Sequence, residues 1–96
     1  MIILGIDPGM AILGYGVIES LNYDMKLLDY GAVTTSSAMD TPKRLLKIFV
    51  SMEELIQKYS PDAIAYEELF FNQNVKTALT VGHARGVAVL AGARQG

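Results

Sequence analysis

The sequence contains no cysteine and only one histidine. The lack of cysteine excludes a disulfide framework and thiolate chemistry, and it fits a reducing cytoplasm but also many other locations. With a single imidazole and no thiol, a zinc site or a serine–histidine–aspartate triad is poorly supplied. Carboxylates are therefore the main candidates for chemistry.

An excess of basic charge is missing too. Eight Lys and Arg residues against ten Asp and Glu residues give a formal net charge of −2, whereas nucleic-acid-binding domains are typically basic. Binding to DNA would then need a local basic patch, a partner subunit or sequence outside these 96 residues. Residues 2–6 are apolar, but the run has no basic flank and is followed by Asp7, so we expect neither a signal peptide nor a membrane span.

The remaining composition is that of a globular domain, with 51% hydrophobic and 19% charged residues. A chain of 96 residues allows one domain, so we predict a single domain over residues 1–96. No internal repeat, low-complexity run or flexible linker divides the sequence.

Three segments near the N-terminus predict strands. Residues 2–6 form a continuous β-branched run that suits a central strand covered on both faces. Residues 14–19 and 26–34 predict two further strands, separated by a polar loop at 22–24. Short connections between three strands predict an antiparallel meander.

The following elements predict a crossover. Thr41 is a candidate N-cap and Pro42 a candidate first helical residue, and apolar residues at spacings of three and four then continue to Tyr59. A short apolar segment at 62–67 comes next, which predicts a strand parallel to the first. A second helix is predicted from Val75 onward. The order is therefore β-β-β-α-β-α, an α/β domain with a mixed sheet.

The second helix is apolar around most of its circumference, so we expect it to be buried on most sides. Gly82 and Gly86 lie four residues apart and predict a close backbone approach. One stripe of the helix is expected to carry the main contacts, formed by Val75, Ala78, Leu79, Gly82, Gly86, Val89, Leu90 and Ala93.

Two carboxylates stand at the ends of predicted strands. Asp7 follows the first strand and Glu67 ends the fourth, so parallel neighbouring strands would bring them to one sheet edge, about 5 Å apart at the backbone. Carboxylates that close repel each other unless a cation lies between them, and a hard divalent ion with oxygen ligands suits the pair. Taken singly, Asp7 is equally an ordinary turn residue, and a glutamate that ends a strand, like Glu67, is usually just a solvated strand end; only the pairing of the two positions favours a functional site.

Other candidate residues follow Glu67. Phe70 or Phe71 either anchors its loop in the core or stacks on an unpaired base, which is worth about 1–3 kcal/mol. Lys76 is the best candidate for a phosphate contact, because it is close in sequence to Glu67 and to the start of the second helix. The other basic residues are expected on solvated faces, namely Lys43, Arg44, Lys47, His83 and Arg85.

The motifs around both carboxylates resemble those of one family. Ile-Leu-Gly-Ile-Asp-Pro-Gly at 3–9, Gly-Tyr-Gly-Val-Ile at 14–18 and Tyr-Glu-Glu-Leu-Phe-Phe-Asn-Gln-Asn at 66–74 resemble RuvC, the bacterial Holliday junction resolvase family. Ala78-Leu79 and Gly-His-Ala-Arg-Gly-Val-Ala at 82–88 continue the match, so the resemblance covers essentially the whole chain. Gly-Ile-Asp-x-Gly also opens actin-like ATPase domains, so the later blocks carry most of the specificity.

The resemblance implies a ribonuclease-H-like fold and a homodimer that cuts four-way DNA junctions in recombination and repair. It implies two Mg²⁺ or Mn²⁺ ions held by four carboxylates, with Asp7 and Glu67 at the first two positions. One ion would activate a water and the other would stabilise the leaving 3′ oxygen. Phe70 matches the aromatic residue that the family uses near the junction, the second helix matches the dimer contact, and Lys76 has no obvious counterpart. Junction-migration helicase machinery is the implied partner.

The family pattern also extends beyond these residues. Its other carboxylates lie on a C-terminal helix, in a segment like Asp-Ala-Ala-Asp-Ala, and neither that helix nor the last strand has a counterpart within residues 1–96. We therefore expect a C-terminally incomplete domain that is inactive or very weak by itself. Uncovered apolar surface and an unpaired sheet edge predict that it associates into an oligomer.

Two alternative functions remain open. Half of an actin-like ATPase or kinase domain would use Asp7-Pro8-Gly9 as a phosphate loop and would bind nucleotide. A non-catalytic junction-binding module would bind junctions in the presence of a chelator and would tolerate Asp7→Asn. A proteolytic piece without a separate function is equally compatible with the sequence.

Overall fold

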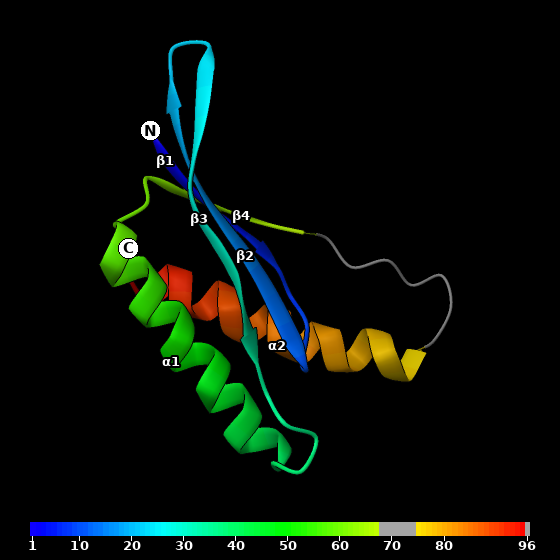
Figure 1. The fold of residues 1–96 in the computed structure, drawn as a ribbon. Coiled ribbons are helices and arrows are strands. Elements are labelled where there is room, and N and C mark those ends of the chain that lie inside the picture. The colour runs from blue at the N-terminus through cyan, green and yellow to red at the C-terminus, as the bar shows by residue number, and fades with distance from the viewer. Residues whose placement is uncertain (68–74, 96) are drawn as a thin grey trace.

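The computed structural model describes residues 1–67 and 75–95. Its elements follow in the predicted order β-β-β-α-β-α, which confirms the mixed α/β architecture (Figure 1). They are β1 (Ile2–Asp7), β2 (Ile12–Leu21), β3 (Asp24–Thr34), α1 (Thr41–Tyr59), β4 (Ala63–Tyr66) and α2 (Val75–Arg94).

The four strands form one sheet in the order β3-β2-β1-β4. The β1, β2 and β3 strands pair antiparallel as the predicted meander, and β4 pairs parallel with β1 after the α1 crossover. The β2–β3 hairpin is longer than predicted, because only Asn22 and Tyr23 separate the two strands. Asn22 has a φ of 56°, a left-handed conformation that asparagine tolerates better than most residues. Figure 1 shows this hairpin projecting beyond the rest of the molecule.

One face of the sheet carries the hydrophobic core. Side chains alternate between the two faces of a strand, and Leu4 and Ile6 of β1 are buried on the side that α1 and α2 cover. In Figure 1, β2 and β3 cross in front of α2, and α1 lies beside the strands. The core consists of Leu4, Ile6, Met10, Leu13, Val17, Ile48, Met52, Ile56, Ala84, Ala88 and Ala91.

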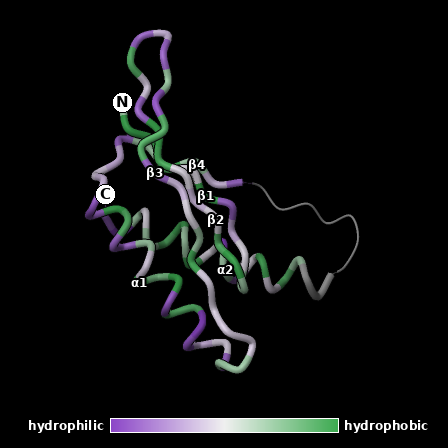
Figure 2. The backbone as a smooth tube through the Cα atoms, in the orientation of Figure 1, coloured by the Kyte–Doolittle hydropathy of each residue, from purple (hydrophilic) through white to green (hydrophobic). Residues whose placement is uncertain are grey.

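The α1 helix begins one residue earlier than the sequence predicted. Asp40, not Thr41, is the N-cap, and its carboxylate accepts a 3.0 Å hydrogen bond from the Lys43 amide. A carboxylate at this position also interacts favourably with the positive end of the helix dipole, which the Thr41 hydroxyl would not do. Ser60, at a φ of 44°, caps the C-terminus of the helix and donates its amide to the Ile56 carbonyl. Figure 2 shows hydrophilic and hydrophobic stretches alternating along α1, as an amphipathic helix requires.

The α2 helix packs on a different stripe from the predicted one. Its buried residues include Ala84, Ala88 and Ala91, whereas Leu79 and Leu90 of the predicted stripe are 58% and 60% exposed. Alanine is small enough to let a helix backbone approach the layer beneath it, so the alanine face turns inward and the leucines remain outside. The prediction that α2 is buried on most sides is therefore wrong for its described residues.

The close backbone approach occurs at Gly92, not at Gly86. A β-carbon on Gly92 would collide with the Tyr66 hydroxyl and lie 3.1 Å from Cδ1 of Ile64, both on β4. A β-carbon on Gly86 would meet nothing within 4 Å. The glycine that allows α2 to lie against β4 was thus not among those singled out in the sequence.

Two basic residues of α1 donate hydrogen bonds to the end of β3. The expected solvated face is wrong for Arg44, which is half-buried, whereas Lys47 is exposed as expected. Arg44 donates from Nε to the hydroxyl of buried Thr35 at 2.8 Å, and the Lys47 ammonium donates to the Thr34 carbonyl at 2.5 Å. Together they attach the start of α1 to the sheet. None of the described helices has the length and apolarity needed to cross a membrane.

Substitution of Gly92 by alanine should destabilise the fold. The Tyr66 hydroxyl that it would strike is held by a hydrogen bond to the Ala88 carbonyl, so the conflict moves the helix, and overpacking of this kind costs about 1–3 kcal/mol. Gly86→Ala, measured on the monomer, is the matched control and should stabilise α2 by about 0.5–1 kcal/mol. Chemical denaturation followed by circular dichroism measures both changes. A Gly92→Ala chain as stable as the unmodified one would contradict the packing described here.

Candidate active site

The parallel pairing of β1 with β4 brings Asp7 and Glu67 side by side. The last register pair of the two strands is Ile6 with Tyr66, so the next residue of each chain is one of the two acids. The Glu67 amide donates to the Ile6 carbonyl at 2.9 Å, which extends the pairing one residue beyond β4. The sequence-predicted neighbourhood of the two acids is therefore present in the fold.

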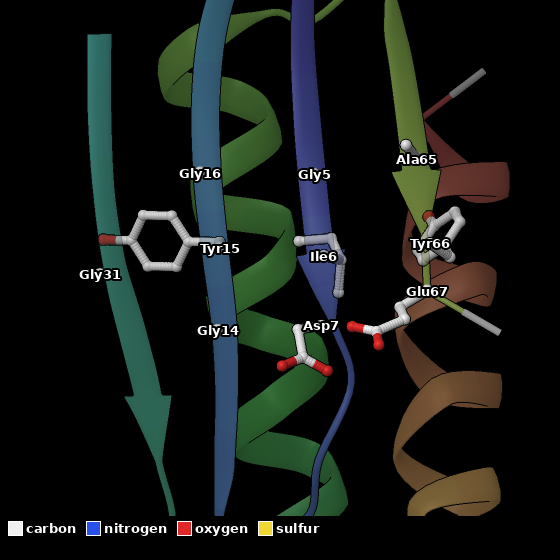
Figure 3. Close-up of a pocket in the computed structure, with 10 residues that line it drawn as sticks. All are labelled: Gly5, Ile6, Asp7, Gly14, Tyr15, Gly16, Gly31, Ala65, Tyr66 and Glu67. Atoms are coloured by element: carbon white, nitrogen blue, oxygen red, sulfur yellow. The ribbon is translucent and has the colours of Figure 1, made fainter. Parts of the chain in front are cut away.

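Both side chains lie on the face of the sheet that the described helices leave open. Asp7 points away from the core because its neighbour Ile6 points into it, and Figure 3 shows the Glu67 side chain extending toward Asp7. Gly14 stands opposite Asp7 in the antiparallel pair with β2. Among the described residues, Gly5, Gly14, Gly16 and Ala65 are small residues that line the open hollow around the acids, which measures about 570 Å³.

The two carboxyl groups perturb each other electrostatically. The pKa of Glu67 is raised above its ordinary value, first by a hydrogen bond with the Asp7 side chain, then by repulsion from its charge, and then by desolvation. Two carboxylates that share a site cannot both ionise freely, so one holds its proton to higher pH. The repulsion marks the position where a cation would be stabilised.

The pKa of Glu67 is shifted by Asp7 and by desolvation, and no positive side chain of the described residues lowers it. In residues 1–67 and 75–95, no group of three or more carboxylate, imidazole or thiol side chains gathers around a common point. The described part of the chain thus brings together two candidate ligands, Asp7 and Glu67.

A residue that the sequence did not single out also reaches the site. Arg85 of α2 donates from Nε to the Glu67 carbonyl at 3.2 Å, although it was expected on a solvated face. One helical turn farther on, the Ala88 carbonyl accepts the Tyr66 hydroxyl at 3.0 Å. No periodicity in the sequence could reveal the Arg85 contact, because it depends on how α2 crosses the end of β4.

The two other site predictions are not tested by this geometry. Phe70, with Phe71, lies outside the described residues. Lys76 belongs to the first turn of α2, but its side chain is outside the described part of the structure. Their proposed contacts with bases and phosphate remain predictions.

The sequence and the fold were compared with known proteins. The family described as "Crossover junction endodeoxyribonuclease RuvC" matches residues 3–96. A protein of that name from Alkaliphilus oremlandii is 63% identical over 93 residues, which are 97% of this chain and 57% of the relative. One from Ruminiclostridium cellulolyticum is 58% identical over 96 residues, or 100% of this chain and 58% of the relative. The chain therefore spans a little more than half the length of these curated relatives.

Solved structures give the same result for the fold. A Thermus thermophilus RuvC in complex with a Holliday junction substrate superimposes with a TM-score of 0.91 at 32% identity, over 98% of this chain and 60% of that one. A second Thermus thermophilus RuvC structure gives a TM-score of 0.86 at 33% identity, over 98% and 58% of the two chains. The predicted ribonuclease-H-like fold is confirmed by this likeness.

Replacement of Asp7 by asparagine should lower the pKa of Glu67 in the metal-free chain. The raised pKa means that folded Glu67 holds its proton to higher pH than a free glutamate does, and the main cause is Asp7. An asparagine amide carries no negative charge and can donate to the ionised carboxylate, so the proton leaves at lower pH. Carbon-13 NMR titration of the Glu67 carboxyl measures the shift. An unchanged or higher value would show that Asp7 does not perturb Glu67.

Proposed function

This chain belongs to the crossover junction endodeoxyribonuclease RuvC family, and we propose that it supplies Asp7 and Glu67 as metal ligands of a nuclease that resolves four-way DNA junctions. The observation that carries the proposal is the β1–β4 register, which sets the two carboxylates side by side on an open face. Because the chain spans 57% of the Alkaliphilus oremlandii relative, the activity is proposed for a protein of the relatives' length. The 96 residues alone are expected to be inactive or very weak.

The donor set fits a hard divalent cation. Mg²⁺ and Mn²⁺ prefer carboxylate oxygens, and Mg²⁺ is commonly bound through one or two carboxylates with water and substrate phosphate completing its shell. Asp7 and Glu67 provide such oxygens, and the raised pKa of Glu67 reflects a mutual repulsion that a cation would relieve. Two ions bound there would supply the charge that activates a water and stabilises the leaving 3′ oxygen of a phosphodiester.

The residues of this chain would position the two carboxylates and leave room for the DNA to reach them. The β1–β4 pairing holds Asp7 at the end of β1 and Glu67 directly after β4, and this attachment to the sheet favours precise placement. Gly14 beside Asp7, together with Gly5 and Ala65 on the same open face, leaves room for a bulky polyanion to approach them. The phosphodiester would then lie over this side of the sheet.

The alternatives are less well supported. A nucleotide-binding half-domain would also begin with Asp7-Pro8-Gly9, but the family match over residues 3–96 favours the nuclease. A non-catalytic junction-binding module would not need two repelling carboxylates at one sheet edge. Junction DNA is the proposed substrate, since the Thermus thermophilus relative was solved in complex with a Holliday junction. A helicase partner and a bacterial cytoplasmic location stay predictions.

We also propose a homodimer through α2. Four exposed residues of this helix, Leu79, His83, Gly86 and Leu90, follow one another at spacings of four, three and four, which places them on one face. Leu79 and Leu90 are among the most exposed apolar side chains of α2, at 58% and 60%. An apolar stripe with a small residue at its centre suits close packing against a second copy.

A hybrid protein tests the nuclease proposal directly. In it, residues 1–96 would replace the corresponding part of the Alkaliphilus oremlandii relative, which supplies the remaining length. The hybrid should cut a synthetic four-way junction in Mg²⁺, and Asp7→Asn or Glu67→Gln should slow cutting more than about a hundredfold, because even outer-shell partners of metal ligands are worth about 10–100-fold.

Glu54→Gln, at an exposed position of α1, is the matched charge control and should cut at the unmodified rate. Cutting that survives Asp7→Asn, or symmetric cutting by the 96-residue chain alone, would contradict the proposal.

Leu90→Lys should weaken self-association. Burial of a leucine side chain contributes about 1.5–3 kcal/mol, so a charge at this position should raise the dimer dissociation constant by at least about tenfold. Leu46→Lys is the control, since Leu46 of α1 is similarly exposed at 61% but lies outside the proposed interface. Sedimentation equilibrium measures both constants. Equal effects of the two substitutions would place the interface elsewhere.

A further inference from the structure

Both main-chain polar groups of Glu67 are bonded to other elements. Its amide donates to the Ile6 carbonyl of β1 at 2.9 Å, and its carbonyl accepts from Nε of Arg85 on α2 at 3.2 Å. Glu67 lies one residue beyond β4 and its side chain is exposed. Its peptide groups are thus fixed by contacts on both sides even though it is outside the regular strand.

These two hydrogen bonds hold the main chain at Glu67, from which the carboxylate side chain extends. The amide bond places the residue next to Ile6 of β1, and the carbonyl bond ties it to Arg85 of α2. A hydrogen bond from a charged donor is about twice as strong as a neutral one. Two ionised carboxylates this close repel each other, so a main chain held on both sides favours keeping the Glu67 side chain beside Asp7.

We infer that Arg85 is a positioning residue, whose guanidinium holds the Glu67 carbonyl so that the Glu67 carboxylate faces Asp7. The expected consequence of this contact, metal binding by the carboxylate pair, rests on the proposed function. The contact between Arg85 and Glu67 does not depend on that function. Arg85 is half-buried on α2 and approaches from the helix side of the sheet. It therefore contacts the main chain of Glu67 and leaves the open face in front of the carboxylate free.

The effect of Arg85 is geometric and not a neutralisation of charge. The hydrogen bond from Arg85 ends on the main-chain carbonyl of Glu67, and among the described residues no ion pair joins the Arg85 and Glu67 side chains. The carboxylate pair therefore keeps its negative potential for a cation while its backbone is held by a cationic side chain.

Tyr66 provides the matched control. Its hydroxyl donates to the Ala88 carbonyl at 3.0 Å, so it also joins the end of β4 to α2 through one hydrogen bond, but it does not contact Glu67 through that group. Tyr66→Phe removes an attachment between the same two elements without touching the Glu67 carbonyl. A general stabilising role for Arg85 predicts that the two substitutions act alike, whereas a positioning role predicts that they differ.

NMR of the 96-residue chain without metal tests the contact. Arg85→Met keeps the aliphatic stem and removes the donor, and it should speed hydrogen exchange of the Glu67 amide about tenfold and weaken the nuclear Overhauser effect between the Asp7 and Glu67 side chains. Arg85→Lys, whose ammonium can reach the same carbonyl, should restore part of both signals. Tyr66→Phe should leave both nearly unchanged. Wild-type signals in Arg85→Met, or equal losses in Tyr66→Phe, would overturn the inference.

The hybrid nuclease described above tests the consequence. Arg85→Met should raise the Mg²⁺ concentration for half-maximal cutting about tenfold with little change in junction affinity, Arg85→Lys should lie between, and Tyr66→Phe should match the unmodified hybrid. An unchanged Mg²⁺ requirement in Arg85→Met would overturn the positioning role. Failure of the unmodified hybrid to cut would instead count against the proposed function, and the NMR comparison would still decide the role of Arg85.

Discussion

The parallel pairing of β1 with β4 is the constraint on which the candidate site depends. Its last hydrogen bond, from the Glu67 amide to the Ile6 carbonyl, sets two acids from distant parts of the sequence side by side. Neither acid is unusual alone, since aspartate is common in turns and glutamate at strand ends. A slip of one residue in this register would turn one carboxylate toward the core, because side chains alternate along a strand. The chemistry therefore follows from the sheet.

The remaining structure serves to hold that register. The α1 and α2 helices bury Leu4 and Ile6, which fixes the face on which Asp7 emerges. Gly92 allows α2 to lie close to β4, where Arg85 reaches the Glu67 carbonyl. Two carboxylates in contact raise the free energy of the folded state when both are ionised. The fold tolerates this repulsion at the site. A bound cation would relieve it, and this relief would favour binding of the cation.

The sequence predicted the element order, the meander and the neighbourhood of Asp7 and Glu67, because those depend on apolar periodicity and on short connections. It mispredicted the buried stripe of α2, since periodicity cannot rank alanine against leucine when most faces of a helix are apolar. It likewise missed Arg85, whose contact arises from the crossing of two elements. Asp40 was missed as N-cap because Thr41 is also a capping residue type and stands directly before Pro42, a residue favoured at the first helical position.

Paramagnetic broadening by Mn²⁺ tests most directly whether the carboxylate pair is a metal site. Nitrogen-15 and carbon-13 spectra of the 96-residue chain would be recorded during a Mn²⁺ titration, which detects even weak binding. Asp7, Glu67 and the neighbouring Gly14 should broaden first, and the double substitution Asp7→Asn with Glu67→Gln should abolish the effect. Broadening that begins elsewhere, or that persists in the double variant, would contradict a metal site at this edge of the sheet.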